Sequence, residues 1–81
     1  MELKEHPLIT IDPEIMRGKP TIKDTRLTVE HVVEELVGGL TPSELLEAYP
    51  RLTPEGLDAA LAYVIDLVSA DAARHLEQAA S

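Results

Sequence analysis

Apolar positions follow two spacings along this chain, first a short alternating one and then a helical one. Residues Leu8–Asp12 are β-branched and partly alternating, which predicts a short strand that ends before Pro13. A second extended segment is expected at Thr21–Lys23. Residues 8–26 are therefore expected to form a β-hairpin-like element whose arms are joined by a loop.

Three predicted helix starts share one device, a leucine followed by a threonine. The threonine hydroxyl accepts a hydrogen bond from an otherwise unpaired backbone N–H, and the preceding leucine packs on the fourth helical residue. Pro42 and Pro54 suit the first helical position, where a missing N–H costs nothing. The sequence thus predicts helices over about 28–37, 42–49 and 54–79, capped by Thr28, Thr41 and Thr53.

Apolar stripes on these helices predict a small trihelical core with helix-turn-helix dimensions. The first stripe consists of Val29, Val32, Val33, Leu36 and Val37, and Gly38 and Gly39 are expected to end that helix. The third consists of Leu57, Ala60, Leu61, Val64, Val68 and Leu76, with a fresh helix start near 69–71 as the alternative to one long helix. We expect one mainly α domain, 1–81, with its core over 28–68 and a helical C-terminal extension over 69–81.

Charge is distributed unevenly along the 81 residues. The formal net charge is −8, so the chain as a whole repels nucleic acid. Residues 17–26 are the exception, because Arg17, Lys19, Lys23 and Arg26 face only Asp24 there. Gly18 and Pro20 bracket Lys19 and are expected to give this loop a fixed shape. These four basic residues, together with Arg51, are the candidate residues for binding a partner protein or nucleic acid.

Catalytic chemistry has little support in the sequence. There is no cysteine, which excludes disulfides, thiolate zinc sites and a cysteine nucleophile. The three histidines have no zinc-site spacing and are expected beside carboxylates, and no glycine-rich phosphate loop exists. We therefore expect no enzyme activity, catalytic residue, metal, cofactor or small-molecule substrate. The longest apolar run, Ala59–Ile65, is too short for a membrane span and the N-terminus does not resemble a signal peptide, so a cytoplasmic location is expected.

The phrases Ile11-Asp12-Pro13, Gly18-Lys19-Pro20 and Ile22-Lys23-Asp24-Thr25-Arg26 occur together in one short stretch. This combination resembles the bacterial family known as domain of unknown function 433, and the resemblance extends over about residues 8–65. It implies a homeodomain-like or winged-helix DNA-binding fold and a role as an antitoxin encoded beside a PIN-like ribonuclease toxin. Asp24 departs from the family pattern, which usually has glycine there. Because aspartate tolerates left-handed and turn conformations, the turn is expected to persist.

The residues of the third helix and of the basic loop limit what can be expected of the implied DNA-binding and antitoxin roles. The expected outward positions of the third helix carry three acids and no base, so DNA binding is expected to be weak for the chain alone and to depend on the basic loop; those positions are Glu55, Asp58, Ala59, Ala62, Tyr63 and Asp66. PIN-type nucleases hold their metal with carboxylates, onto which an arginine forks bidentately and displaces the metal. The alternative for Arg26 is a salt bridge to a nearby glutamate or a hydrogen bond that caps a local carbonyl, with Lys19 and Lys23 solvated.

Two functions from different classes therefore remain open. The first is an antitoxin-like regulatory protein that neutralises a PIN-like ribonuclease toxin and binds its own operator DNA. The second is a non-catalytic dimeric interaction domain without DNA binding. A homodimer is expected because the third helix continues past Val64 with Ile65, Leu67 and Val68, and because a short strand around Ile9 and Ile11 would leave an open edge. The alternative is that this apolar surface is kept for the toxin-like partner, with the tail after Ser69 becoming ordered only on binding.

Overall fold

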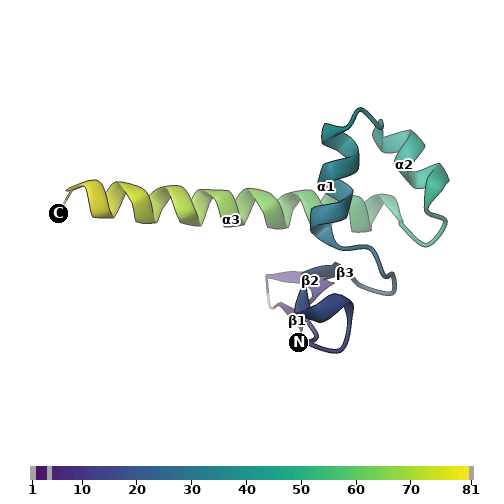
Figure 1. The fold of residues 1–81 in the computed structure, drawn as a ribbon, viewed down its shortest axis with the longest axis horizontal. Coiled ribbons are helices and arrows are strands. Elements are labelled where there is room, and N and C mark those ends of the chain that lie inside the picture. Colours follow the sequence, from purple (N-terminus) through teal and green to yellow (C-terminus); the bar gives the residue numbers. More distant parts are fainter. Residues whose placement is uncertain (1, 4, 81) are drawn as a thin grey trace.

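The computed structural model describes residues 2–3 and 5–80, and the side chains of residues 5–75. A small sheet comes first, made of β1 (Glu2–Leu3), β2 (His6–Thr10) and β3 (Thr21–Ile22). Three helices follow, α1 (Val29–Val37), α2 (Pro42–Ala48) and α3 (Pro54–Ala80). In Figure 1 the long helix α3 lies horizontally, with α1 and α2 on one side of its N-terminal half and the sheet on the other. The predicted fold class, mainly α with an N-terminal β element before three helices, is confirmed.

The sheet is antiparallel with the order β1-β2-β3, so β2 lies in its middle. Ile9 pairs with Ile22 and is fully buried. The expectation that the strand around Ile9 leaves an open edge is therefore wrong, because β1, which has no pattern in the sequence, covers its other side. β2 also ends earlier than expected, since the carboxylate of Asp12 accepts a hydrogen bond from the Glu14 N–H at 2.9 Å and begins a turn.

All three helices begin at the predicted threonine caps. The hydroxyl oxygens of Thr28, Thr41 and Thr53 accept hydrogen bonds from the third residue of α1, α2 and α3, at 3.0, 3.2 and 3.0 Å. In α2 the Glu44 carboxylate accepts in return from the Thr41 N–H at 3.0 Å, which completes a capping box. Hydrogen bonding of the Glu44 carboxylate to the Thr41 backbone N–H, and then to the Thr41 side chain, holds the pKa of Glu44 below its ordinary value of 4.5.

α1 ends at the predicted pair of glycines, and the second of them carries the left-handed conformation. Gly39 has a φ of +112°. Its N–H donates to the Leu36 carbonyl at 3.1 Å, and the Leu40 N–H donates to the Glu35 carbonyl at 3.0 Å. This pair of bonds is a Schellman motif, which satisfies carbonyls that the end of a helix leaves unpaired.

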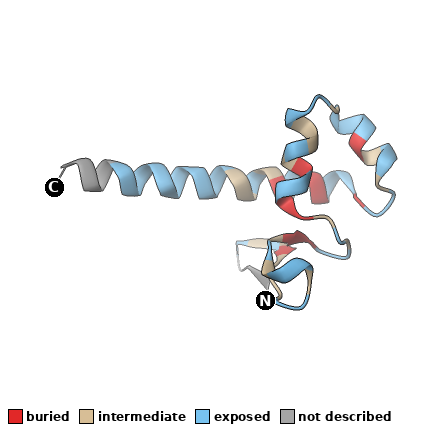
Figure 2. Ribbon diagram, in the orientation of Figure 1, coloured by how far each residue is buried: buried red, intermediate tan, exposed pale blue. Residues whose placement is uncertain are grey.

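The core lies between the sheet, α1, α2 and the first turns of α3 (Figure 2). Its buried apolar residues are Ile9, Ile22, Val29, Val32, Leu45, Leu52, Leu57 and Ala60. Two residues of the predicted stripes lie outside it. Val37 is 82% exposed because it is the last residue of α1, and Val68 is 63% exposed because the core follows α3 only to Val64. The side chain of Leu76 lies outside the described residues.

Two histidines tie the elements together, each beside a tyrosine and a carboxylate. His6 on β2 contacts Asp66 of α3 at 2.7 Å and lies edge-on to Tyr63. His31 on α1 contacts the Tyr49 hydroxyl at 2.9 Å and Glu35 at 3.3 Å. Burial, then the nearby Glu35, raises the pKa of Tyr49.

The expected pairing of histidines with carboxylates is thus confirmed, and His75 also contacts Asp71, at 3.8 Å. The outward placement of Ala59 and Tyr63 is wrong. Both side chains are half-buried against the core, because β2 packs on that side of α3. Glu55, Asp58, Ala62 and Asp66 are exposed as expected.

α3 continues without a break through residues 69–71, so the alternative of a fresh helix start there is wrong. Near its beginning it approaches the sheet closely. A Cβ added to Gly56 would lie 3.1 Å from the Cγ2 atom of Ile22, so only glycine allows this distance between α3 and β3 without a shift. Across the described part of the chain, no helix is apolar for long enough to cross a membrane.

Candidate binding face

The basic segment begins with a turn of unusual hand. Met16, Arg17 and Gly18 form one short 3₁₀ turn in which all three have positive φ, at +49°, +58° and +81°. The Gly18 N–H donates to the Ile15 carbonyl at 3.1 Å and the Lys19 N–H to the Met16 carbonyl at 3.2 Å. For residues with a side chain this conformation costs about 1–2 kcal/mol each. The surrounding structure must hold the turn in place.

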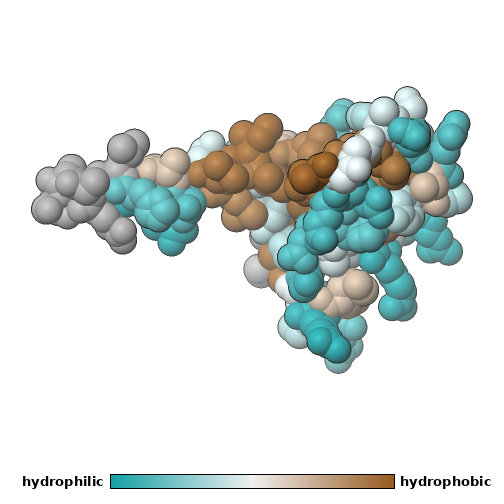
Figure 3. Space-filling view, turned by 45° about the horizontal axis from the view of Figure 1, so that its top comes forward, coloured by the Kyte–Doolittle hydropathy of each residue, from teal (hydrophilic) through white to brown (hydrophobic). Residues whose placement is uncertain are grey.

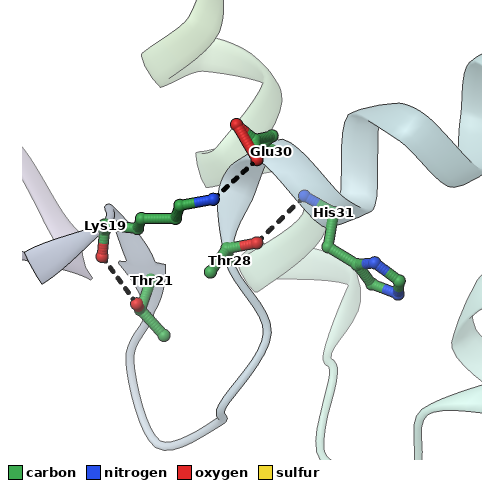
Figure 4. A network of polar contacts seen from close by, with 5 residues as sticks. All are labelled: Lys19, Thr21, Thr28, Glu30 and His31. Carbon is green, nitrogen blue, oxygen red and sulfur yellow. Dashed lines mark hydrogen bonds and ion pairs between the residues drawn. The ribbon is translucent and has the colours of Figure 1, made fainter. Parts of the chain in front are cut away.

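The backbone after this turn is fastened to the core on both sides. The Val29 N–H donates to the Pro20 carbonyl at 2.9 Å, and the Ile22 N–H donates to the Leu27 carbonyl at the same distance. The buried hydroxyl of Thr21 donates to the Lys19 carbonyl at 2.8 Å. Figure 4 shows Thr21 beneath Lys19, which reaches across to Glu30 at the start of α1. The basic side chains therefore project from a fixed backbone.

The second turn of the segment contains the residue that departs from the family pattern. The Thr25 N–H donates to the Ile22 carbonyl at 3.1 Å, and Asp24 inside this turn has a φ of +63°. A positive φ at this place explains the usual glycine, and Asp24 adopts it as expected. The Thr25 hydroxyl closes the turn by donating to the Ile22 carbonyl at 2.7 Å and accepting from the Leu27 N–H at 3.0 Å.

The five predicted basic residues lie around this segment, and we call them the basic face: Arg17, Lys19, Lys23, Arg26 and Arg51. An open hollow of about 580 Å³ on one side is lined by Arg17, Lys19 and Arg26 together with Glu30 and Glu34. A second, of about 440 Å³, is lined by Lys23, Arg26 and Arg51 with Asp12 and Asp24. Arg26 lines both hollows and joins the two groups.

Arg51 reaches this face from the turn between α2 and α3, 25 residues along the chain from Arg26. It shares a further hollow of about 420 Å³ with Arg26 and Tyr49, and no acidic residue lines that one. Arg51 is the one lysine or arginine between residues 41 and 73, yet nothing in the sequence places it beside the loop. Its position follows from the packing of α2 and α3 on the core.

The cations of this face differ in how they are paired. Lys19 forms an ion pair with Glu30 at 3.0 Å, so the expectation that it is merely solvated is wrong. Among the residues that the structure describes, Arg17, Arg26 and Arg51 have no ion pair and no side-chain hydrogen bond. The alternative in which Arg26 bridges to a nearby glutamate is therefore wrong. Three exposed guanidinium groups are left available to an external carboxylate or phosphate.

The side chains of this face share one kind of chemistry. Guanidinium and ammonium groups donate hydrogen bonds and accept none, so the five side chains suit an anionic surface. Within residues 5–75, no group of three or more histidine, aspartate or glutamate side chains is placed to hold a metal ion. The outward positions of α3 expose Glu55 and Asp58 instead, and these carboxylates oppose a phosphate backbone.

Comparisons with known proteins point to one family. The model of the family described as "Protein of unknown function (DUF433)" matches residues 9–64. The crystal structure of a DUF433 member protein from Anabaena variabilis is similar to this chain, with a TM-score of 0.70 and 37% sequence identity. The match covers 73% of this chain and 58% of that one, so this chain spans less than two thirds of its length. A search of curated proteins found no match.

Proposed function

The chain belongs to the DUF433 family, and from that premise we propose that it is an antitoxin-like regulatory protein whose basic face neutralises a PIN-like ribonuclease. The observation that carries this proposal is the set of three unpaired guanidinium groups on the basic face of a chain with a net charge of −8. A face of this kind favours a partner with clustered carboxylates.

The carboxylate cluster of a PIN-like nuclease is such a partner. Arg17 and Arg26 both line one open hollow, so individual carboxylates of the partner could contact both guanidinium groups at its edge. Each guanidinium can take one carboxylate in a two-pronged arrangement, which competes with the metal that the nuclease needs for cleavage. The fastened backbone supports this role because little conformational freedom remains to be lost on binding.

Inhibition of a nuclease tests the proposal directly. The probe is the PIN-like ribonuclease encoded beside the gene for this chain, assayed for RNA cleavage with and without the purified protein. The wild type is expected to suppress cleavage. The double variant R17A/R26A is expected to lose at least about 100-fold in inhibition, since each charge-assisted pair contributes roughly 1.5–3 kcal/mol. The absence of such a reading frame beside the gene would count against the proposal.

Arg74 provides a matched control for this experiment. It is exposed on α3, far along the chain from the basic face, and contacts Asp71 at 3.5 Å. R74A removes the same type of charge, and inhibition is expected to stay within about twofold of the wild type because surface changes away from an interface have small effects. Equal losses in R74A and R17A/R26A would indicate that net charge, rather than the basic face, is responsible.

DNA binding enters the proposal only through the same face. In a helix-turn-helix protein the second helix of the motif, here α3, enters the DNA groove. The exposed carboxylates of α3 oppose such docking, so we expect weak operator binding by the chain alone. Fluorescence anisotropy on a duplex from upstream of its own gene tests this over a salt series. Replacement of Lys19, Lys23 and Arg26 by alanine is expected to flatten the log–log salt slope by about 2.7. Tight binding at physiological salt that these changes leave intact would contradict this part of the proposal.

A further inference from the structure

The second half of α3 leaves the body of the protein with its apolar side chains uncovered. Ile65 and Val68 are each 63% exposed and Leu67 is 50% exposed. In Figure 3 these apolar atoms form a continuous brown surface along the middle of the helix. A helical segment of about 12–15 residues is only marginally stable by itself in water. The exposed half of α3 therefore gains from a cover that this chain does not itself supply.

The spacing of the exposed apolar residues indicates the shape of that cover. Leu61, Ile65, Val68 and Ala72 follow one another at intervals of four, three and four, which is the spacing of a coiled-coil stripe. They are half-buried or exposed in the structure. Such a narrow stripe fits one further helix packed alongside, and we call these four residues the seam.

The residues at the ends of the seam indicate the identity and direction of that helix. Continuing the same heptad places Asp58 one turn before the seam and His75 one turn after it, and both are exposed. If a second copy of α3 runs antiparallel, Ile65 faces Val68 of that copy and Leu61 faces its Ala72. Asp58 then faces its His75. The stripe is thus complementary to itself when reversed.

A parallel arrangement lacks this match. It would place Asp58 opposite Asp58 of the second copy, and like charges at facing positions are destabilising. It would also bring both bodies to the same end, since the sheet, α1 and α2 all lie along the N-terminal half of α3 (Figure 1). The antiparallel arrangement puts the bodies at opposite ends and uses the exposed half of each helix to cover the other.

We propose that the chain forms a homodimer through its seam, with α3 of one copy antiparallel to α3 of the other. This inference is independent of the proposed nuclease partner, because no residue of the basic face belongs to the seam. The occupant of the exposed apolar surface is a second copy, argued from the self-complementary order of Asp58, the seam and His75.

Sedimentation equilibrium of the full chain tests the interface. A mass of twice 8.9 kDa is expected at protein concentrations of roughly tens to hundreds of micromolar, which corresponds to weak association. V68D is expected to raise the dissociation constant at least about tenfold, because it places an unpaired carboxylate in the seam. The control A70D adds the same charge on the opposite side of α3 and is expected to leave the mass unchanged. A wild type that stays monomeric, or equal effects of V68D and A70D, would overturn the proposal.

Cysteine cross-linking tests the relative direction of the two α3 helices. The sequence has no native cysteine, so only the introduced thiols can react. In the double variant L61C/A72C, each new thiol is expected to face its partner in the second copy, giving a disulfide-linked dimer under mild oxidation. L61C alone is expected to remain uncross-linked, because the two positions would be offset by 11 residues, about 17 Å along the seam. Cross-linking of L61C alone at the yield of the double variant would show a parallel dimer and refute the antiparallel arrangement.

Discussion

The first and second halves of α3 belong to one uninterrupted helix but have different surroundings. Over 54–64, Leu57 and Ala60 are buried beneath the sheet and α1, and over 65–75 every side chain is exposed. The apolar pattern continues across this boundary while the packing does not. The difference shows that helical periodicity identifies an apolar face but not what covers it, since a core and an intermolecular seam require the same spacing.

The largest expected contrast comes from one substitution made in each half. L57A removes a buried side chain, and a loss of about 2–5 kcal/mol in unfolding free energy is expected. L67A removes the same atoms from a half-exposed position outside the seam, and a loss below about 1 kcal/mol is expected. Urea unfolding at low micromolar concentration measures both. Similar losses would show that the second half is packed as tightly as the first.

Hydroxyl groups provide the next test of the difference. Thr53 caps the packed half, so T53A is expected to lower the unfolding free energy by about 1 kcal/mol. Ser69 lies inside the continuous second half and caps no helix, so S69A is expected to stay within about 0.5 kcal/mol of the wild type. Thermal unfolding distinguishes the two. A cost for S69A equal to that for T53A would favour a helix break near this residue.

Two aspartates extend the comparison to the loop. Asp24 has positive φ, so D24G is expected to raise the unfolding free energy by about 0.5 kcal/mol through relief of backbone strain. D71G is the matched change within the helix, where glycine is a poor helix former and no gain is expected. A loss of stability in D24G would show that its side chain contributes more than its backbone conformation costs.

The smallest expected effect is a pH dependence of the unfolding free energy that arises from the capping box of α2. Because hydrogen bonds from Thr41 lower the pKa of Glu44, its ionised form stabilises the fold above the unfolded-state pKa. This contribution is lost as pH falls through the folded-state pKa, which lies below 4.5. In E44Q it is absent at all pH values, so the stability difference from the wild type should shrink between about pH 6 and about pH 3. A difference that stays constant over this range would contradict the capping role.

Short capping motifs in the sequence predicted much of the helical part of the fold. The leucine–threonine starts and Gly38–Gly39 specified where α1, α2 and α3 begin and where α1 ends, because capping depends on residues within one turn. The two-residue strands β1 and β3 are different. Thr21–Ile22 was visible as an extended segment, but Glu2–Leu3 is too short to show a period and is paired only through tertiary contact.

The basic face was predicted in composition but not in geometry. Lys19 and Arg26 stood out by charge. The left-handed turn at Met16 and Arg17 could not be predicted in the same way, because neither of these residues is a glycine. The approach of Arg51 to Arg26 depends on how α2 and α3 pack, which no local pattern encodes. Two glutamates of α1 contact other side chains in place of Arg26, Glu30 with Lys19 and Glu35 with His31.

Gly56 connects the basic face with the seam, because it lies where α3 approaches Ile22 of β3. Ile22 belongs to β3, whose strand leads directly into the turn that carries Lys23 and Arg26, and Gly56 belongs to α3, which carries the seam. The absence of a side chain at this position lets β3 lie close to α3, because an added Cβ would lie 3.1 Å from the Cγ2 atom of Ile22. In the proposed dimer this closeness would influence how far apart the two basic faces lie and whether they point the same way. A larger residue at this position would shift β3 on α3 and so change the spacing of the two basic faces, without altering any residue of either face.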